Sequence, residues 1–314
     1  MTIGFQIGDE AFHKIYEVVN TSIDYSSPVD EHFVCRYCNE TDSKKFRSIA
    51  HLLPEFTGNK EIFCYNECDD CNAKFGLYET NLNAFCGIKN TFIPIKGKKK
   101  FQKFRDEKSK FTTQFKEGNK VEMNLESNNK NFITYDNGKL NIQSTTQSFI
   151  PLYVYKSLIK FAISMIDKKD LNKFSKVIEW LSTPTKIHGE DENIMSLQLL
   201  HNESRPPLIK PVATLMKRKS DYLKNNIPEF TFIFAFGFHR FQIFLPYNSD
   251  DLNLLSKESI ILPVHCQLFA QVQANSNKGA FKHYDMNMLE KRNIKDDFKV
   301  NIKPIKGDLN DLNT

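Results

Sequence analysis

Two cysteine pairs with the same spacing constrain the fold of this chain more than any other feature. Cys35 and Cys38 lie in "CRYC", and Cys68 and Cys71 lie in "CDDC". Paired thiolates at this spacing can close a tetrahedron around one zinc ion, and a site with no open position is structural rather than catalytic. Residues 31–90 contain little apolar sequence and need such a crosslink to fold. The pattern therefore predicts a small domain at 31–90 built around structural zinc.

The compartment and the remaining cysteines bear on this prediction. The N-terminus has no apolar run of signal-peptide length, and no stretch approaches 18 apolar residues, so we expect a cytoplasmic protein without a membrane partner. Disulfide or redox pairs are the alternative, which a reducing compartment disfavours. We expect Cys64 to pack as a small buried hydrophobe, with replacement of one of the four ligands as the alternative. Cys86 and Cys266 are expected to be structural.

The segment between and after the pairs has a definite order of predicted elements. "KFRSIAHLL" and "KEIFCYN" flank the turn "PEFTGN", which predicts a hairpin carrying His51. "DDCNAKFGLYET" predicts a helix that begins near Cys68, with two acidic residues suited to the dipole of its first turn. Asn72 then lies in the opening turns of this helix, directly after a zinc ligand.

This layout resembles the HNH endonucleases, whose ββα-metal core is often stapled by two CxxC knuckles. The matching motifs are "CRYC", "AHLLPEFTGN" and "ECDDCNAKFG", within residues 33–80. The resemblance implies a treble-clef-like nuclease core in which His51 is the general base, Asn59 braces the base and its loop, and Asn72 holds the catalytic cation. It further implies Mg²⁺- or Mn²⁺-dependent hydrolysis of DNA, leaving 5′-phosphate and 3′-hydroxyl ends. Small nucleases of this kind often serve bacterial anti-phage defence or restriction.

The residue types agree with this chemistry. Histidine, with an ordinary pKa near ~6.5, can accept a proton at neutral pH. Mg²⁺ prefers oxygen ligands and keeps several waters, so an asparagine carbonyl and phosphate oxygens can suffice. Many relatives carry an acidic ligand directly before the histidine, where this chain has Ala50, so a second protein ligand stays open among Glu55, Glu67 and Asp69.

Plainer interpretations exist for the same residues. A lone histidine is usually a core residue, and the flanking motifs are what favour catalysis for His51. Asn59 could act only as a turn residue after Gly58.

A basic tract, "KGKKKFQKFRDEKSK", follows the predicted core at residues 96–110. We interpret residues 91–110 as a solvated linker or a DNA-contacting arm. Phe101 and Phe104 are expected to pack against the core rather than stack on bases. The candidate phosphate contacts are Lys98, Lys99, Lys100, Lys103 and Arg105.

The rest of the chain predicts an α+β fold without a recognisable motif. Residues 1–30 form a lead-in with a helix over 10–19, and short alternating runs predict an antiparallel meander over 111–144. Helices are expected over 151–166 and about 171–181, then two strands hinged at Gly237 and a strand in "SIILPVHCQLF". His239 and His265 are interpreted as structural. Residues 111–290 would form an accessory α+β domain for sensing, self-association or docking of a protein partner, and residues 291–314 a weakly ordered tail.

Three hypotheses follow from the sequence. The leading one is a metal-dependent HNH-type DNA endonuclease with an accessory domain. The second is a non-catalytic, zinc-stapled nucleic-acid-binding protein, for which Ala50 is the best argument. The third is a protein–protein adaptor on a treble-clef core, with thin support from the acidic pair Asp69–Asp70.

Overall fold

The computed structural model of the chain describes residues 2–25, 33–97, 100–106, 108, 111–125, 132–185, 197–222, 226–245, 251, 254, 259–265 and 281–301. Its strands are β1 Thr2–Ile7, β2 Tyr16–Thr21, β3 Ala50–His51, β4 Phe63–Cys64, β5 Lys103–Asp106, β6 Phe111–Lys116, β7 Lys120–Leu125, β8 Ile133–Asp136, β9 Lys139–Thr145, β10 Gln198–Arg218, β11 Phe230–Phe244, β12 Ser259–Val264, β13 Lys282–Asp285 and β14 Lys295–Asn301. Its α-helices are α1 Asp9–Ile15, α2 Asp69–Cys86, α3 Pro151–Ser164, α4 Lys168–Leu171 and α5 Ser175–Ser182. Short 3-10 helices are η1 Ser43–Lys45, η2 Glu55–Thr57, η3 Gly87–Phe92, η4 Asn172–Phe174 and η6 Ser220–Tyr222.

The architecture is mixed α+β, as the sequence predicts. A long, twisted antiparallel pair, β10 with β11, forms the main sheet, and β13 and β2 pair with opposite ends of β10. Among the described pairings, only β1 with β12 is parallel. Within the described part of the chain, no helix is both long enough and apolar enough to cross a membrane.

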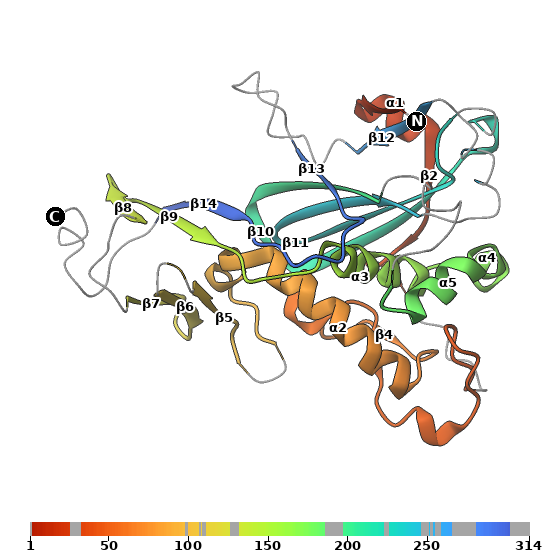
Figure 1. The fold of residues 1–314 in the computed structure, drawn as a ribbon, viewed down its shortest axis with the longest axis horizontal. Helices are drawn as coiled ribbons and strands as arrows, with labels where there is room; N and C mark the ends of the chain where they lie inside the picture. Colours follow the sequence, from red (N-terminus) through yellow and green to blue (C-terminus); the bar gives the residue numbers. More distant parts are fainter. Residues whose placement is uncertain are drawn as a thin grey trace.

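Helix α3 lies at the centre of the molecule, between the β10–β11 pair and α2 (Figure 1). Every residue of α3 is buried, including two lysines. Pro151 at its first turn suits a helix start, because its missing N–H would have no partner there. Since both long neighbours pack on it, α3 connects the cysteine-rich segment to the main sheet.

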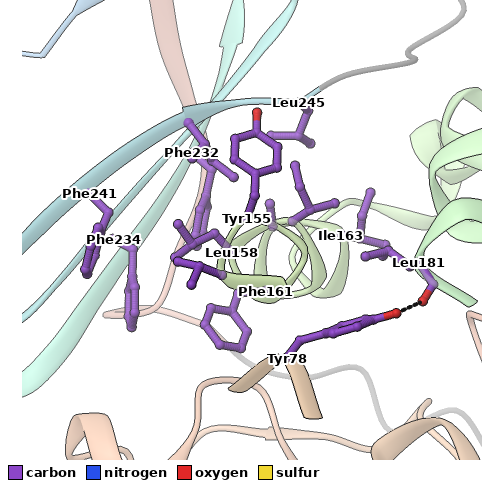
Figure 2. Packing of buried hydrophobic residues seen from close by; sticks show 14 of the residues in the cluster. Tyr78, Tyr155, Leu158, Phe161, Ile163, Leu181, Phe232, Phe234, Phe241 and Leu245 are labelled. Atoms are coloured by element: carbon purple, nitrogen blue, oxygen red, sulfur yellow. Dashed lines mark hydrogen bonds between the residues drawn. The ribbon is translucent and has the colours of Figure 1, made fainter. Parts of the chain in front are cut away.

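Aromatic side chains fill the space between α3 and the main sheet. Phe161 of α3 meets Phe234 of β11 edge to face, with ring centroids 5.5 Å apart. Below the helix, the Tyr78 hydroxyl of α2 donates a 3.0 Å hydrogen bond to the Leu181 carbonyl of α5 (Figure 2). One hydrophobic cluster thus includes residues of the cysteine-rich segment, α3, α5 and the main sheet. The predicted domain boundaries stay predictions, but the described residues on both sides of residue 100 share this core.

The long strand β10 was not anticipated from the sequence. Pro206, Pro207 and Pro211 interrupt its pattern. The strand accommodates them at register shifts between Glu203 and Leu208 and again before residue 212. Prolines are tolerated at such irregularities because no ladder hydrogen bond is required of them there.

The predicted pair of strands hinged at Gly237 is wrong, because residues 230–244 form the single strand β11. Gly237 has a positive φ of 50° and lies opposite Leu208, where the register is irregular. A Cβ at this position would lie 2.5 Å from Ile93 Cδ1. The glycine therefore permits a close approach within a continuous strand rather than a turn.

The predicted helix over 10–19 is also wrong in its second half. Helix α1 ends at Ile15, and the chain continues as β2, which pairs with the end of β10. Val18 and Val19 favour an extended backbone, and the exposed edge of β10 supplies its hydrogen bonds. The second predicted helix, over 171–181, is divided into α4, η4 and α5.

The predicted meander has the right strands in the wrong arrangement. β6 and β7 join β5 in one sheet, whereas β8 and β9 join β14 in another. β14 lies in the predicted weakly ordered tail, so that prediction is wrong for residues 295–301. Phe298 of β14 is buried opposite Ile142, which anchors the strand despite its charged neighbours. Residues 302–314 lie outside the described residues.

Candidate metal centre and histidine site

The two cysteine pairs meet in one cluster. The sulfur atoms of Cys35, Cys38, Cys68 and Cys71 all lie within 4.8 Å of one another. The Cys38 and Cys68 sulfurs are 3.6 Å apart. Sulfurs bound tetrahedrally to zinc at ~2.3 Å would lie about 3.8 Å apart, so the cluster has nearly the required size. The four cysteines could therefore bind a zinc ion.

The donor set of the cluster also fits zinc. Four sulfur donors suit Zn²⁺ rather than Mg²⁺, which prefers oxygen. A hydrogen bond from the Cys71 thiol lowers the pKa of Cys35 to about 4, and the same contact raises the pKa of Cys71. Cys64 is buried outside the cluster, opposite Ala50 in the β3–β4 pair, and burial raises the pKa of its thiol. It packs as the small hydrophobe that the sequence predicts.

The first cysteine pair and the two residues between its members (residues 35–38, the first knuckle) pack on the C-terminus of α3. Arg36, between the first two cysteines, donates hydrogen bonds to the carbonyls of Ser164 and Ile166. The adjacent Tyr37 hydroxyl lies 2.7 Å from Ser164 Oγ and 3.2 Å from the Lys160 carbonyl. The last carbonyls of a helix lack partners within the helix, and a cation there also complements its dipole. The cysteine cluster is thereby fixed to the central helix.

His51 lies at the end of β3, beside a carboxylate. β3 pairs with β4 so that His51 faces Phe63, and the two rings lie 4.9 Å apart. Its Nε2 is 3.3 Å from Glu55 Oε1, and the two side chains are 25% and 27% exposed. Ala50 is buried, because adjacent residues of a strand point to opposite faces. Position 50 therefore faces the interior rather than the partly exposed side of His51.

Asn59 holds the loop that joins β3 to β4. Its Nδ2 donates to the Leu53 and Ile62 carbonyls at 2.7 and 2.8 Å, and its Oδ1 accepts from the Glu61 and Ile62 amides. The residue before it, Gly58, has a φ of 99°, and a Cβ there would lie 2.2 Å from the Ile209 carbonyl oxygen. These contacts hold the backbone of the loop in place.

Asn72 lies in the first turns of α2 and is half-buried. The helix begins after Cys68, whose carbonyl accepts the Asn72 amide at 2.9 Å. Asp69, in the same turn, accepts hydrogen bonds from the Ser48 amide and from Arg47. The Ser48 amide is the main cause of the lowered pKa of Asp69. Asp69 therefore holds the two residues just before β3, and its carboxylate already has hydrogen-bond partners.

A buried ion cluster joins α3 to this region. Lys160 Nζ lies 3.0 Å from Glu67 Oε2, 3.8 Å from Glu79 Oε1 and 3.3 Å from the His51 carbonyl oxygen. Burial alone would lower the pKa of Lys160, but the two carboxylates outweigh it and raise the pKa. Burial raises the pKa of Glu79 to about 7. Glu79 lies two turns after Asn72 on the same face of α2, so Lys160 connects β3, the second knuckle and that face.

Lys160 and Glu79 were missed from the sequence. The available signal was a pair of lysines four residues apart, Lys156 and Lys160, in an otherwise apolar helix. Lysines that are buried with such a helix need partners, which can be acidic groups or carbonyls. Lys156 donates hydrogen bonds to the carbonyls of Trp180, Thr183 and Thr185.

The basic tract lies beside the loop that carries Glu55. Gln102 donates to the Phe56 carbonyl of η2 at 2.8 Å, and Lys60 donates to the Gly97 carbonyl at 3.2 Å. Lys103 and Arg105 are exposed on β5, whereas Phe104 between them is buried, as expected. Part of the predicted linker is therefore a strand. Lys100 is exposed, and Lys98 and Lys99 lie outside the described residues.

His201, His239, His265 and Cys86 are buried within the described part of the chain. His239 of β11 is buried and pairs with His201, with Nδ1 and Nε2 3.1 Å apart. His265 is buried against Phe12. Cys86 is buried at the end of α2, and Cys266 lies outside the described residues.

Comparisons with known proteins identify no family for this chain. No protein-family model matches it, and no curated protein or solved structure shows significant similarity to it.

Proposed function

We propose that this protein is an HNH-type endonuclease that hydrolyses DNA phosphodiester bonds. The observation that carries the proposal is the arrangement of His51 on a hairpin and Asn72 on the helix that follows, which begins directly after Cys68 of the four-cysteine cluster. Zinc at these cysteines would be structural, because all four tetrahedral positions are filled by protein. A rigid support of this kind is what a catalytic constellation requires.

In this proposal His51 accepts the proton of the attacking water. Asn59 supports the loop behind it, and Asn72 contributes its side-chain oxygen to the cation site. A bound Mg²⁺ or Mn²⁺ would balance charge on the phosphate. Exposed cations of the basic tract, including Lys100, Lys103 and Arg105, would contact the phosphates flanking the scissile bond.

The alternative is a zinc-stapled protein that binds nucleic acid without cutting it. Two carboxylates near the proposed cation site are engaged elsewhere, Glu67 with Lys160 and Asp69 with Arg47. Ala50 supplies no ligand. These features favour the alternative, because Asn72 would then be the main protein ligand of the cation.

Incubation with supercoiled plasmid separates the two functions. The wild-type protein with Mg²⁺ or Mn²⁺ should nick the plasmid, and His51→Ala or removal of the cation with EDTA should abolish nicking. His283→Ala, which removes an exposed histidine of β13, is the matched control and should cut normally. Nicking that survives His51→Ala would remove His51 as the base. Salt-sensitive binding without cutting by the wild type would establish the alternative.

A further inference from the structure

We propose that Glu55 is a positioning residue for His51, orienting its imidazole and stabilising the positive charge that forms on it. The proposal rests on the proposed function for its role in cutting, but the pairing itself can be tested without activity. The sequence left Glu55 as one of three candidate cation ligands. The geometry points to a different role.

The contact between the two side chains is direct and local. Glu55 Oε1 lies 3.3 Å from His51 Nε2, and both side chains are about a quarter exposed. A carboxylate at this distance from an imidazole nitrogen favours the charged form of the ring. The pairing thus stabilises the protonated ring that forms when His51 acts as a base.

The loop holds Glu55 in place. It begins the short helix η2, which ends at Thr57 and is followed by Gly58, where the left-handed backbone and the nearby Ile209 carbonyl exclude a side chain. Asn59 then fixes the backbone on both sides of the loop through four hydrogen bonds. A glutamate on such a support can hold one orientation of a neighbouring ring.

The charges around Glu55 argue against a divalent cation at its carboxylate. Lys60 Nζ lies 3.9 Å from the same Oε1 that faces His51. Lys60 also donates to the Gly97 carbonyl, which holds its ammonium on this side of the loop. An ammonium and an imidazole on one carboxylate oxygen would repel Mg²⁺. Among the described contacts, Lys160 of α3 also approaches His51, at its backbone carbonyl.

The proton balance of the step is simple. Water gives a proton to the imidazole of His51 as its oxygen bonds to phosphorus, and the bond from phosphorus to the 3′ oxygen breaks. The leaving oxygen takes a proton from solvent and becomes a hydroxyl. The Glu55 carboxylate stabilises the imidazolium, as carboxylates do beside catalytic histidines.

Glu55→Gln tests the proposal, with Glu61→Gln as the matched control. Glu61 is two-thirds or more exposed, pairs only with Lys210 among its described ion pairs, and makes no described contact with His51. In Glu55→Gln, kcat should fall about 10- to 100-fold. The acidic limb of the pH profile of kcat/KM should move to lower pH. Glu61→Gln should leave both unchanged.

A measurement on the resting protein keeps this test separate from the proposed function. ¹⁵N NMR of the full-length, histidine-labelled protein follows protonation of His51, assigned with His51→Gln. The midpoint should move to lower pH in Glu55→Gln and stay in place in Glu61→Gln. An unchanged midpoint overturns the proposal, even if Glu55→Gln cuts slowly. A shifted midpoint in a protein that cuts no DNA supports the pairing and rejects only the nuclease.

Discussion

The side chain of Asn59 is fully engaged with the backbone of the loop between β3 and β4. All the polar atoms of its side chain are used by the loop backbone, and the residue is buried. An asparagine so occupied cannot also contact a substrate. Its contribution to any chemistry is therefore the fixed position of the β3–β4 loop.

Replacement of this asparagine should destabilise the protein. Asn59→Ala leaves two carbonyls and two amides of the loop without their partners, at an expected cost of about 3 kcal/mol in the free energy of unfolding. Urea denaturation followed by circular dichroism measures it. Asn124→Ala, at an exposed position of β7, should cost less than about 0.5 kcal/mol. Equal effects of the two substitutions would contradict the bracing role.

The buried pair His201 and His239 predicts sensitivity to acid. Burial lowers the pKa of His201 to about 3 and lowers the pKa of His239 as well. Between pH 3 and ~6.5 the unfolded chain binds more protons at these sites than the folded protein does. The free energy of unfolding is therefore not reduced by these histidines above pH ~6.5, and it falls as the pH drops below that value.

Between pH 6.5 and 5.5 the loss should be about 1 kcal/mol for each histidine. Thermal unfolding across this range measures the slope, which His201→Asn should reduce. His283→Gln, at an exposed site, should leave the slope unchanged. A slope in His201→Asn as steep as in the wild type would show that the pair does not cause it.

At the scale of elements, α3 connects the parts of the molecule through its C-terminus and through the buried ion cluster around Lys160. Its C-terminus is capped by the first knuckle, and Lys160 in its third turn joins Glu67 and Glu79. The buried Lys160 ammonium thus contacts a residue of the second cysteine pair's flank, a residue of α2 and the backbone carbonyl of His51.

Lys160→Met should therefore be strongly destabilising, because it leaves two carboxylates without their counter-charge. The expected cost is about 3–5 kcal/mol. The double variant Lys160→Met/Glu67→Gln should cost less than the single variant, since one charge is removed with its partner. Lys96→Met, which breaks an exposed pair with Glu117, should cost less than about 1 kcal/mol. A double variant less stable than the single one would refute the coupling.

The elements predicted correctly are those whose signals are local. The cysteine spacing, the hairpin turn and the start of α2 each lie within a few residues, so the order hairpin, knuckle, helix could be derived. β10 and the division of the predicted meander depend on pairing between distant segments, which a local pattern does not record. The role of Lys160 could not be predicted for the same reason, because its partners are more than 80 residues away in the chain.

At the scale of the whole molecule, the cysteine cluster belongs to the main core. Cys35, Cys68 and Cys71 lie in the same hydrophobic cluster as α3 and β11. Loss of zinc should therefore loosen the packing of α2 and α3 and lower the melting temperature of the entire chain, beyond the knuckles themselves.

Metal analysis with cysteine variants tests this dependence. The wild type should bind about one zinc ion per chain, as expected for one four-sulfur site. Cys71→Ser should lose the metal and show faster hydrogen exchange in α3. Cys64→Ala, at a buried cysteine outside the cluster, should keep its zinc. Zinc retained in Cys71→Ser and lost in Cys64→Ala would mean that the ligand set is wrong.

The most direct test of the central claim is the single-turnover rate of plasmid nicking with saturating protein and Mg²⁺. Loss of a general base costs about 10²- to 10⁴-fold in the chemical step. The wild type should therefore nick at least about 100-fold faster than His51→Ala, with both proteins binding the plasmid equally and both retaining zinc. Equal rates for the two proteins, whether measurable or nil, would contradict the account.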